Sequence, residues 1–339
     1  MMKVRQITLF SSGLNRKTEY MFDVAIQIVT HNHAPTIQAC LLAVNAQQHV
    51  TYSVHLLDNA STDSTVEHIR TLGYEVFCSP HNLGYSAAHN QLLEQGNSRY
   101  VLTLNPDAIL QPDFLYHMVH ALDQNPKAGA AAGCLLRIEG PDDEPSCIDG
   151  AGLMMQRNRR QYLRCEGQPV NAAPRQMEPI FGPDGAAAFY RRAMLDDIQV
   201  MDEVFDNDFF MHKEDVDICW RAQLRGWSAL YVPDAVGYHI RTFRAGQRAN
   251  IHPAIRRHAV RNRYLLMLKN EQWRHFLVDL IPILFYDAKI IAYLLFFERS
   301  SLHAFIDLLR LLPRMRVKRR LIQQGRRTNW QATRLWFEH

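Results

Sequence analysis

The sequence predicts an α/β fold in which helices cover both faces of a mostly parallel sheet. Apolar, strand-like runs alternate with helical patterns from residue 23 onward, and a polar loop follows each of the first strand-like runs. Alternation of this kind is typical of βαβ units, which place ligand-binding loops beyond the carboxyl ends of the strands. One rim of the sheet is therefore expected to carry the polar chemistry.

The composition is that of a globular protein with one large domain and an appendage, or with two domains. The chain has 339 residues, of which 47% are hydrophobic and 21% charged, and its formal net charge is +4. Its six cysteines are scattered without a close pair, which argues against a zinc knuckle or a disulfide framework and predicts a cytoplasmic location. Residues 1–21 contain no long apolar run and are interpreted as an N-terminal extension without a secretory signal.

The first third of the chain repeats a strand, a polar loop and a helix. Apolar, β-branched runs predict the strands, and the patterns between them predict the helices. The expected strands are residues 24–29, 53–57, 75–78 and 100–104, and the expected helices are residues 37–47, 65–72 and 86–95. The polar loops after the strands are residues 30–32 (THN), 58–63 (DNASTD), 82–84 (NLG) and 105–107 (NPD).

The alternation weakens after residue 124. Residues 128–136 are consistent with a strand, and residues 140–179 are rich in Gly, Pro, Arg and polar residues, which we interpret as a mobile acceptor-side region. Two strands are expected at 228–232 and 235–240, and a basic helix at 253–269. The composition changes near residue 270, so we expect a catalytic domain at 22–270 and a helical tail at 271–339.

The stretch 209–221 (FFMHKEDVDICWR) places three carboxylates, Glu214, Asp215 and Asp217, among apolar residues. Crowding and burial raise the proton affinity of at least one carboxylate in such a cluster, which suits a general base. The alternative is a helix start, because acidic residues in a first turn favour the positive end of the helix dipole.

Asp107 directly follows an apolar strand, where Pro106 turns the chain. A carboxylate there suits Mg²⁺ or Mn²⁺, which proteins hold with one or two ligands plus phosphate oxygens and water. His239, at the end of a later strand, is a candidate second ligand. Each has a simpler interpretation as well, Asp107 as part of a turn and His239 as a structural histidine.

Taken in order, these motifs resemble glycosyltransferase family 2, whose members use nucleotide sugars and have a GT-A fold, and particularly its rhamnosyltransferase-like branch. The resemblance covers residues 23–269. The matching segments are Thr30-His31-Asn32, residues 58–63, Asn82-Leu83-Gly84, residues 104–107, Gly185-Ala186, residues 214–221, Gly226-Trp227 and His239. Two positions depart from the family pattern: His31 stands where the branch has Tyr, and Asn105 where the metal motif often begins with Asp.

The resemblance implies roles for particular residues. Asp58 would read the nucleotide base, Asp107 and His239 would bind the metal, and Asp215 would be the catalytic base with Glu214 beside it. The remaining nucleotide-sugar-binding candidates are Thr30, Asn32, Asn59, Asn82, Gly84 and Asn105. Together they imply an inverting transfer, with rhamnose as the best guess, from a dTDP- or UDP-sugar to a glycan or lipid-linked hydroxyl with Mn²⁺ or Mg²⁺.

The tail is apolar first and basic afterwards. Residues 276–297 are long enough to span a bilayer, but Asp279, Asp287 and Lys289 oppose a simple span. About eight basic side chains then lie among leucines, a composition that binds anionic headgroups. We expect a peripheral protein on the inner face of the cell membrane. Nucleic acid is the alternative partner, which we do not expect, and a tail packed on the catalytic domain with a solvated basic face is a further alternative.

Two other functions remain open at this stage. A nucleotidyltransferase can share the sheet and the metal carboxylate, but it normally has a Gly-rich basic loop after the first strand, which residues 30–36 lack. A non-catalytic carbohydrate-binding protein would have a decayed site, whereas Asp107, Asp215 and His239 are all present.

Overall fold

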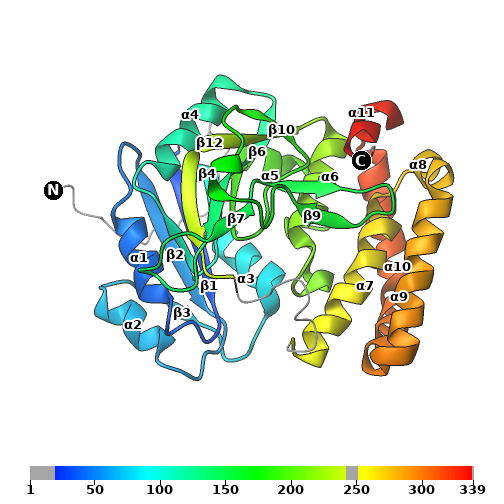
Figure 1. The fold of residues 1–339 in the computed structure, drawn as a ribbon, viewed down its shortest axis with the longest axis horizontal. Coiled ribbons are helices and arrows are strands. Elements are labelled where there is room, and N and C mark those ends of the chain that lie inside the picture. The colour runs from blue at the N-terminus through cyan, green and yellow to red at the C-terminus, as the bar shows by residue number, and fades with distance from the viewer. Residues whose placement is uncertain (1–19, 242–250, 338–339) are drawn as a thin grey trace.

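The structure, a computed structural model, describes residues 20–241 and 251–337. Its first part alternates strands and helices as the sequence predicts (Figure 1). The elements are β1 (Phe22–Thr30), α1 (Ile37–Asn45), β2 (Tyr52–Asp58), α2 (Thr65–Thr71), β3 (Phe77–Cys78), α3 (Gly84–Leu93), β4 (Ser98–Leu104), β5 (Ala108–Leu110), α4 (Phe114–Gln124) and β6 (Ala128–Arg137). Of the expected N-terminal extension, only residues 20 and 21 lie within the described residues.

The main sheet has the strand order β10-β12-β6-β11-β4-β1-β2-β3. The other strands in this order are β10 (Glu178–Ile180), β11 (Ala187–Arg191) and β12 (Ser228–His239), and β5 pairs with β12 and β7 (Cys147–Gly150) with β6 as further members of the same sheet. Strands β3, β2, β1 and β4 are parallel, and so are β6 and β12. Because β11 is antiparallel to both β4 and β6, the two parallel groups point the same way, which confirms the mostly parallel sheet.

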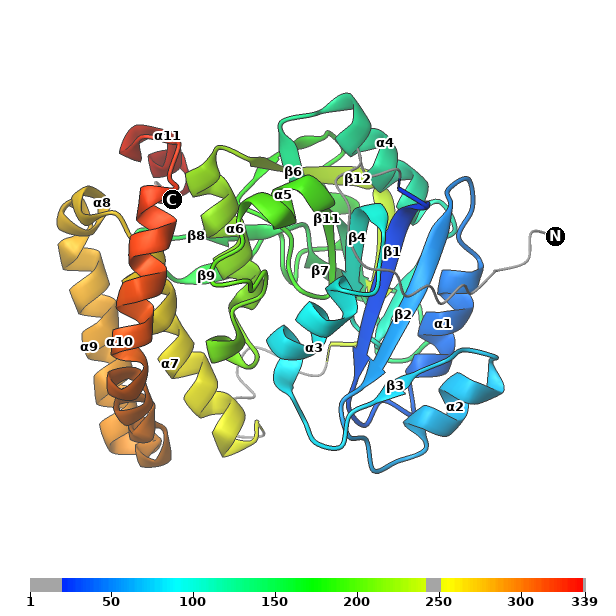
Figure 2. The ribbon, with the colours of Figure 1, turned by 180° about the vertical axis from the view of Figure 1, so that it is seen from behind.

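Side chains that alternate along a strand enter two separate apolar cores. In β4, Tyr100, Leu102 and Leu104 pack in the core that α1, α2 and α4 cover, whereas Val101 packs in the core under α3, α5 (Arg192–Asp197) and α6 (Glu214–Arg225). The two views of the ribbon show these helices on opposite faces of the sheet (Figures 1 and 2). Helices on both faces are therefore confirmed.

The middle of the chain has more strands than the composition suggested. Residues 140–179 contain β7 (Cys147–Gly150), the hairpin of β8 (Leu153–Met155) and β9 (Gln161–Leu163), and the start of β10. The two strands expected at 228–232 and 235–240 are one strand, β12, whose register shifts between Tyr231 and Val236. Pro233 lies within this shift, where its missing N–H leaves no ladder bond unmade.

The tail consists of helices that pack on the catalytic domain. They are α8 (Trp273–Val278), α9 (Leu280–Phe297), α10 (His303–Gln324) and α11 (Trp330–Arg334), and they follow α7 (Pro253–Asn270), which lies side by side with α9 and α10 in both views (Figures 1 and 2). An apolar cluster joins α6 to this layer through Trp220, Leu265, Met315, Ile322 and Phe337. Since α7 contacts both α6 and α10, it connects the two expected domains, and the division near residue 270 stays a prediction.

A buried lysine also joins the tail to the domain. The side chain of Lys318, on α10, is 1% exposed. Its ammonium pairs with Asp206, with Asp208 at 2.8 Å and with Glu203 at 3.0 Å. Removing one partner from a buried ion pair leaves the remaining charges in a poorly solvated environment.

We therefore expect Lys318→Ala to lower the free energy of unfolding by about 3–5 kcal/mol. The matched control on the same helix is Arg310→Ala, whose side chain is 75% exposed and for which a change within about 0.5 kcal/mol is expected. Urea denaturation of both variants measures the difference. An equal decrease in the free energy of unfolding for the two variants would mean that the buried ion pairs of Lys318 do not hold the tail on the domain.

Candidate functional site

Neighbouring parallel strands bring Thr30 and Asp58 together at the rim of the sheet. The two residues are register partners at the ends of β1 and β2. The Thr30 hydroxyl donates to Asp58 Oδ1 at 2.8 Å, and the Ser61 amide donates to Asp58 Oδ2 at 2.9 Å. These donors fix the orientation of a buried carboxylate on the last residue of β2.

Asparagine side chains connect the loop 58–63 to the loops 30–32 and 82–84. Asn59 accepts from the Leu83 amide at 2.7 Å, and Gly84 donates to Asn82 at 2.8 Å. Asn32, whose φ is 61°, accepts from the Thr62 amide at 2.8 Å. The structure thus gathers the nucleotide-sugar candidates Thr30, Asn32, Asp58, Asn59, Asn82 and Gly84 into one set of loops.

Asp107 and His239 meet on the same rim. His239 Nε2 lies 3.2 Å from Asp107 Oδ1, and both residues are buried. On its other side, His239 Nδ1 lies 2.8 Å from Asp149, whose carboxylate also accepts from Arg137 and Arg241. Burial lowers the pKa of His239, but the carboxylates of Asp107 and Asp149 outweigh it and raise the pKa to about 9.

This pair of residues fits a divalent cation. Asp107 Oδ1 is buried and accepts no hydrogen bond, since the close imidazole is not aligned to donate to it. An imidazole held by a carboxylate on one nitrogen presents the other nitrogen to a metal, an arrangement frequent in metal sites. Within residues 20–241 and 251–337, no three His, Cys, Asp or Glu side chains form a metal-binding group, so a cation here would take its other ligands from phosphate and water.

The backbone of Gly185 and Ala186 connects the loop that carries Asp107 to the acidic helix α6. The Asn105 amide donates to Ala186 O at 2.8 Å, and the adjacent Gly185 amide donates to Asp215 Oδ2 at 3.1 Å. Asn105 belongs to the loop that carries Asp107, so Asp107 and Asp215 border the same part of the molecule. Gly185 and Ala186 are the G-A motif of the sequence.

Glu214 and Asp215 are the first two residues of α6, at its positive end. Burial raises the pKa of Asp215 above its ordinary range, and the nearby Asp184 adds to this, while the Val216 and Gly185 amides oppose it. Burial and the charge of Asp215 raise the pKa of Glu214, whose Oε2 accepts no hydrogen bond. The pair can hold and release protons near neutral pH.

Asp217 has a different role from its two neighbours. It is fully buried and pairs with Arg221 at 2.9 Å and with Lys269 at 2.8 Å, and it accepts from Asn270 at 2.7 Å. With all these partners, Asp217 fixes α6 against α7. Asp217 is thus part of the packing between the two helices, and the role of Asp215 as a general base stays a prediction.

Sequence reasoning missed three polar residues of this region. Asp149 holds His239 from a segment interpreted as a mobile loop, and no local pattern marks it. Asp184 accepts from the Ala186 amide at 2.9 Å, and burial raises its pKa. The Tyr85 hydroxyl donates to Gly185 O at 3.3 Å. Asp184 and Tyr85 had a usable signal, because Asp184 immediately precedes the G-A motif and Tyr85 immediately follows the N-L-G motif.

An open groove of about 400 Å³ lies away from these residues. Its lining contains none of the site candidates and no acidic residue. It is formed by Trp273 at the start of α8 and by Arg316, Arg319, Arg320, Gln323 and Arg326 on and after α10.

Comparisons with known proteins agree with this arrangement. The model of the family described as glycosyl transferase family 2 matches residues 25–199. The chain is 28% identical over 250 residues to N-acetylglucosaminyl-diphospho-decaprenol L-rhamnosyltransferase of Mycobacterium tuberculosis, covering 67% of this chain and 78% of the relative.

Two solved structures share the fold. TarS 1-349 of S. aureus, in complex with UDP-GlcNAc, superposes with a TM-score of 0.54 at 15% identity, covering 89% of this chain and 91% of that one. GalNAc-T7 with UDP, GalNAc and Mn²⁺ superposes with a TM-score of 0.57 at 13% identity over 73% of this chain, which spans 48% of the GalNAc-T7 chain. The GT-A fold expected from the sequence is confirmed.

Gly84 offers a direct test of how these loops are packed. Its φ is +81°, and an added Cβ would lie 2.5 Å from the Phe210 ring and 2.6 Å from the Phe210 carbonyl oxygen. Gly73 has a similar φ of +80° but nothing within 4 Å. Gly73→Ala therefore carries only the cost of the left-handed backbone, about 1–2 kcal/mol. We expect Gly84→Ala to lower the free energy of unfolding, measured by urea denaturation, by more than Gly73→Ala does. Equal decreases in the two variants would contradict the close packing of Gly84 against Phe210.

Proposed function

The chain belongs to glycosyl transferase family 2 and is a glycosyltransferase, and we propose that it moves a sugar from a nucleoside-diphosphate sugar to a hydroxyl with inversion of the anomeric centre. The observation that carries this proposal is the Asn105–Ala186 and Gly185–Asp215 pair of hydrogen bonds. Through them, the loop proposed to hold the donor adjoins a carboxylate whose pKa suits a base.

Asp215 is the proposed base. It takes the proton of the acceptor hydroxyl as that oxygen bonds to the anomeric carbon, while the bond from this carbon to the diphosphate oxygen breaks and the nucleoside diphosphate leaves with the electron pair. A single displacement of this kind needs one base and inverts the configuration. Glu214, beside it, is proposed to contact the donor or acceptor sugar.

Asp107 and His239 are the proposed ligands of Mn²⁺ or Mg²⁺. A divalent cation, when bound there, offsets the negative charge that develops on the leaving diphosphate. The chain's own contribution is orientation: Asp149 fixes the imidazole, and the Arg137 and Arg241 side chains hold Asp149 in turn. Asp58 and the loops of Thr30, Asn32, Asn59, Asn82, Gly84 and Asn105 are proposed to hold the nucleoside and the sugar.

The sugar and the acceptor are proposed from the relatives. The mycobacterial relative is named as a rhamnosyltransferase whose acceptor is a diphosphate-linked lipid. We propose rhamnose from a dTDP donor as the first choice and a UDP-sugar as the second, with a glycan or lipid-linked hydroxyl as acceptor. A nucleotidyltransferase is disfavoured because residues 30–36 carry no Gly-rich basic loop.

We also propose that the outer surface of α8–α10 contacts an anionic membrane. Acidic and basic side chains of the tail lie in different places. All five acidic residues of 271–326 pair with arginines of the β8–β9 hairpin, of α7 or of α11. These acidic residues are Glu271, Asp279, Asp287, Glu298 and Asp307. By contrast, Lys289, Arg316 and Arg320 are exposed. A surface with cationic but no unpaired acidic side chains complements anionic headgroups.

The same surface is apolar. Ile281 is 81% exposed and Phe285 63%, and Trp273, Phe296 and Leu309 are exposed as well. By length and composition α9 could cross a bilayer, with a mean hydropathy of 1.9. Its Asp287, however, pairs with Arg263 on α7 and its Leu294 packs there, so we propose that α9 stays on the domain and lies in the membrane interface on the cytoplasmic side.

Nucleotide binding provides the test of the donor site. We expect dTDP or UDP with Mn²⁺ to raise the melting temperature of the wild type, because ligands that bind only the native state stabilise it. Asp107→Ala should abolish the Mn²⁺-dependent part, whereas the exposed Asp113→Ala should retain it. No shift with dTDP, UDP or GDP would favour a non-catalytic carbohydrate-binding protein instead.

The pH dependence of turnover tests the base. Asp215 acts unprotonated, so kcat/KM should fall as the pH drops through its raised pKa. The acid limb is expected near the raised pKa of Asp215, about 6, whereas an ordinary aspartate titrates at about 3.9. A profile that stays flat down to about pH 4 would exclude Asp215 as the titrating base.

Vesicle binding tests the membrane surface. We expect sedimentation with phosphatidylglycerol vesicles, little with phosphatidylcholine, and at least a tenfold loss in the double variant Arg316→Glu and Arg320→Glu. Charge reversal of the exposed Arg70 and Arg175, outside the tail, is the control and should leave binding within about twofold. If both double variants lose binding equally, only net charge matters and the proposed surface is wrong.

A further inference from the structure

The loop that delivers the two acidic residues to the site has an unfavourable backbone. Phe210, His212 and Lys213 all have positive φ values, of 62°, 68° and 72°. Non-glycine residues adopt this region at a cost and remain there only where their surroundings fix them. Lys213 is the N-cap residue directly before α6, so its conformation sets the position of Glu214 and Asp215.

One side chain of α7 fixes this loop. Asn262 is fully buried, and its amide nitrogen donates to the carbonyl oxygens of Phe209 at 2.9 Å, Met211 at 2.8 Å and His212 at 2.8 Å. An amide has two hydrogens for these three acceptors, so one hydrogen is shared. The neighbouring Arg261 donates to the carbonyls of Asp208 and Phe209, and to Asn262 Oδ1 at 3.0 Å.

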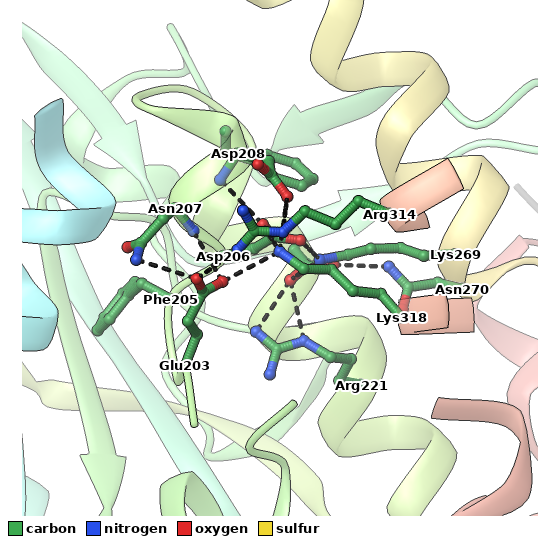
Figure 3. A network of polar contacts seen from close by, with 12 residues as sticks. Glu203, Phe205, Asp206, Asn207, Asp208, Arg221, Lys269, Asn270, Arg314 and Lys318 are labelled. Carbon is green, nitrogen blue, oxygen red and sulfur yellow. Dashed lines mark hydrogen bonds and ion pairs between the residues drawn. The ribbon is translucent and has the colours of Figure 1, made fainter. Parts of the chain in front are cut away.

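Ion pairs hold α7 against the acidic helix and the segment before the loop. Lys269, further along α7, pairs with Asp206 and Asp217, and Lys318 of α10 pairs with Asp206 and Asp208. Figure 3 shows these side chains converging on the 203–208 segment from α7 and α10. The carbonyls that Asn262 contacts lie directly after this segment.

We propose that Asn262 is a positioning residue for the catalytic carboxylates, holding the strained 209–213 loop so that Asp215 meets the Gly185 amide. The inference rests on the proposed role of Asp215. Asn262 contacts neither carboxylate itself and acts through the backbone of residues 209–212. The same loop reaches the nucleotide side, because the Phe210 carbonyl accepts from the Ser86 amide at 3.2 Å and Phe210 abuts Gly84.

The test compares two asparagines of the same helix. Asn262→Ala should lower kcat about 10- to 100-fold with the KM for the donor within about threefold, since a small misplacement of a catalytic group has effects of that size. Amide hydrogen exchange of residues 209–216 should become faster. Asn270→Ala removes an equally buried amide that contacts Asp217 rather than the loop, so the amide exchange of residues 209–212 should stay as slow as in the wild type.

If Asn262→Ala does not fold, Asn262→Ser provides the same comparison. Exchange of residues 209–212 in the Asn262 variant that is as slow as in Asn270→Ala would overturn the inference. The exchange measurement is independent of the reaction, so the inference and the proposed function can fail separately. Full turnover in Asp215→Asn would remove the base assignment, whereas unchanged exchange in the Asn262 variant would remove the positioning role alone.

Discussion

The burial of Glu214 and the partial burial of Asp215 at the start of α6 are the constraint on which the rest of this structure depends. With little water around them, the two carboxyl groups keep raised pKa values that suit proton transfer at neutral pH. Burial also requires that the surrounding groups be placed accurately. The turn before β11 supplies the Gly185 amide, and α7 supplies Asn262, which fixes the loop before α6, and Lys269, which pairs with Asp217 of α6.

The tail meets the domain through an apolar cluster and through buried ion pairs, and its outer surface is apolar too. Arginines and lysines of α7 and α10 pair with acidic residues in the contact, whereas Ile281, Phe285 and Phe296 are exposed. The helices are thus part of the structure that holds the acidic helix, and they also present the surface proposed to meet the membrane. Contact with lipid and placement of Asp215 would then depend on the same helices.

The sequence predicted the parts of the protein that depend on local pattern. Apolar, β-branched runs and the loops after them located β1, β2 and β4 and brought Thr30, Asp58 and Asp107 to one rim. The interpretation failed where distant contacts decide: two strands were expected at 228–232 and 235–240 where β12 is one, and a composition rich in Gly, Pro, Arg and polar residues hid β7 and with it Asp149. Asn262 could not be found either, because its role depends on a loop about 50 residues away that the helix pattern does not reveal.

The most direct test of this account is the turnover of Asp215→Asn, measured with the donor nucleotide that stabilises the wild type. An amide cannot take the acceptor's proton but can still accept from the Gly185 amide. We expect kcat to fall about 100- to 10,000-fold while the nucleotide binds as before. Undiminished turnover would contradict the account, because the base would then have to be another residue.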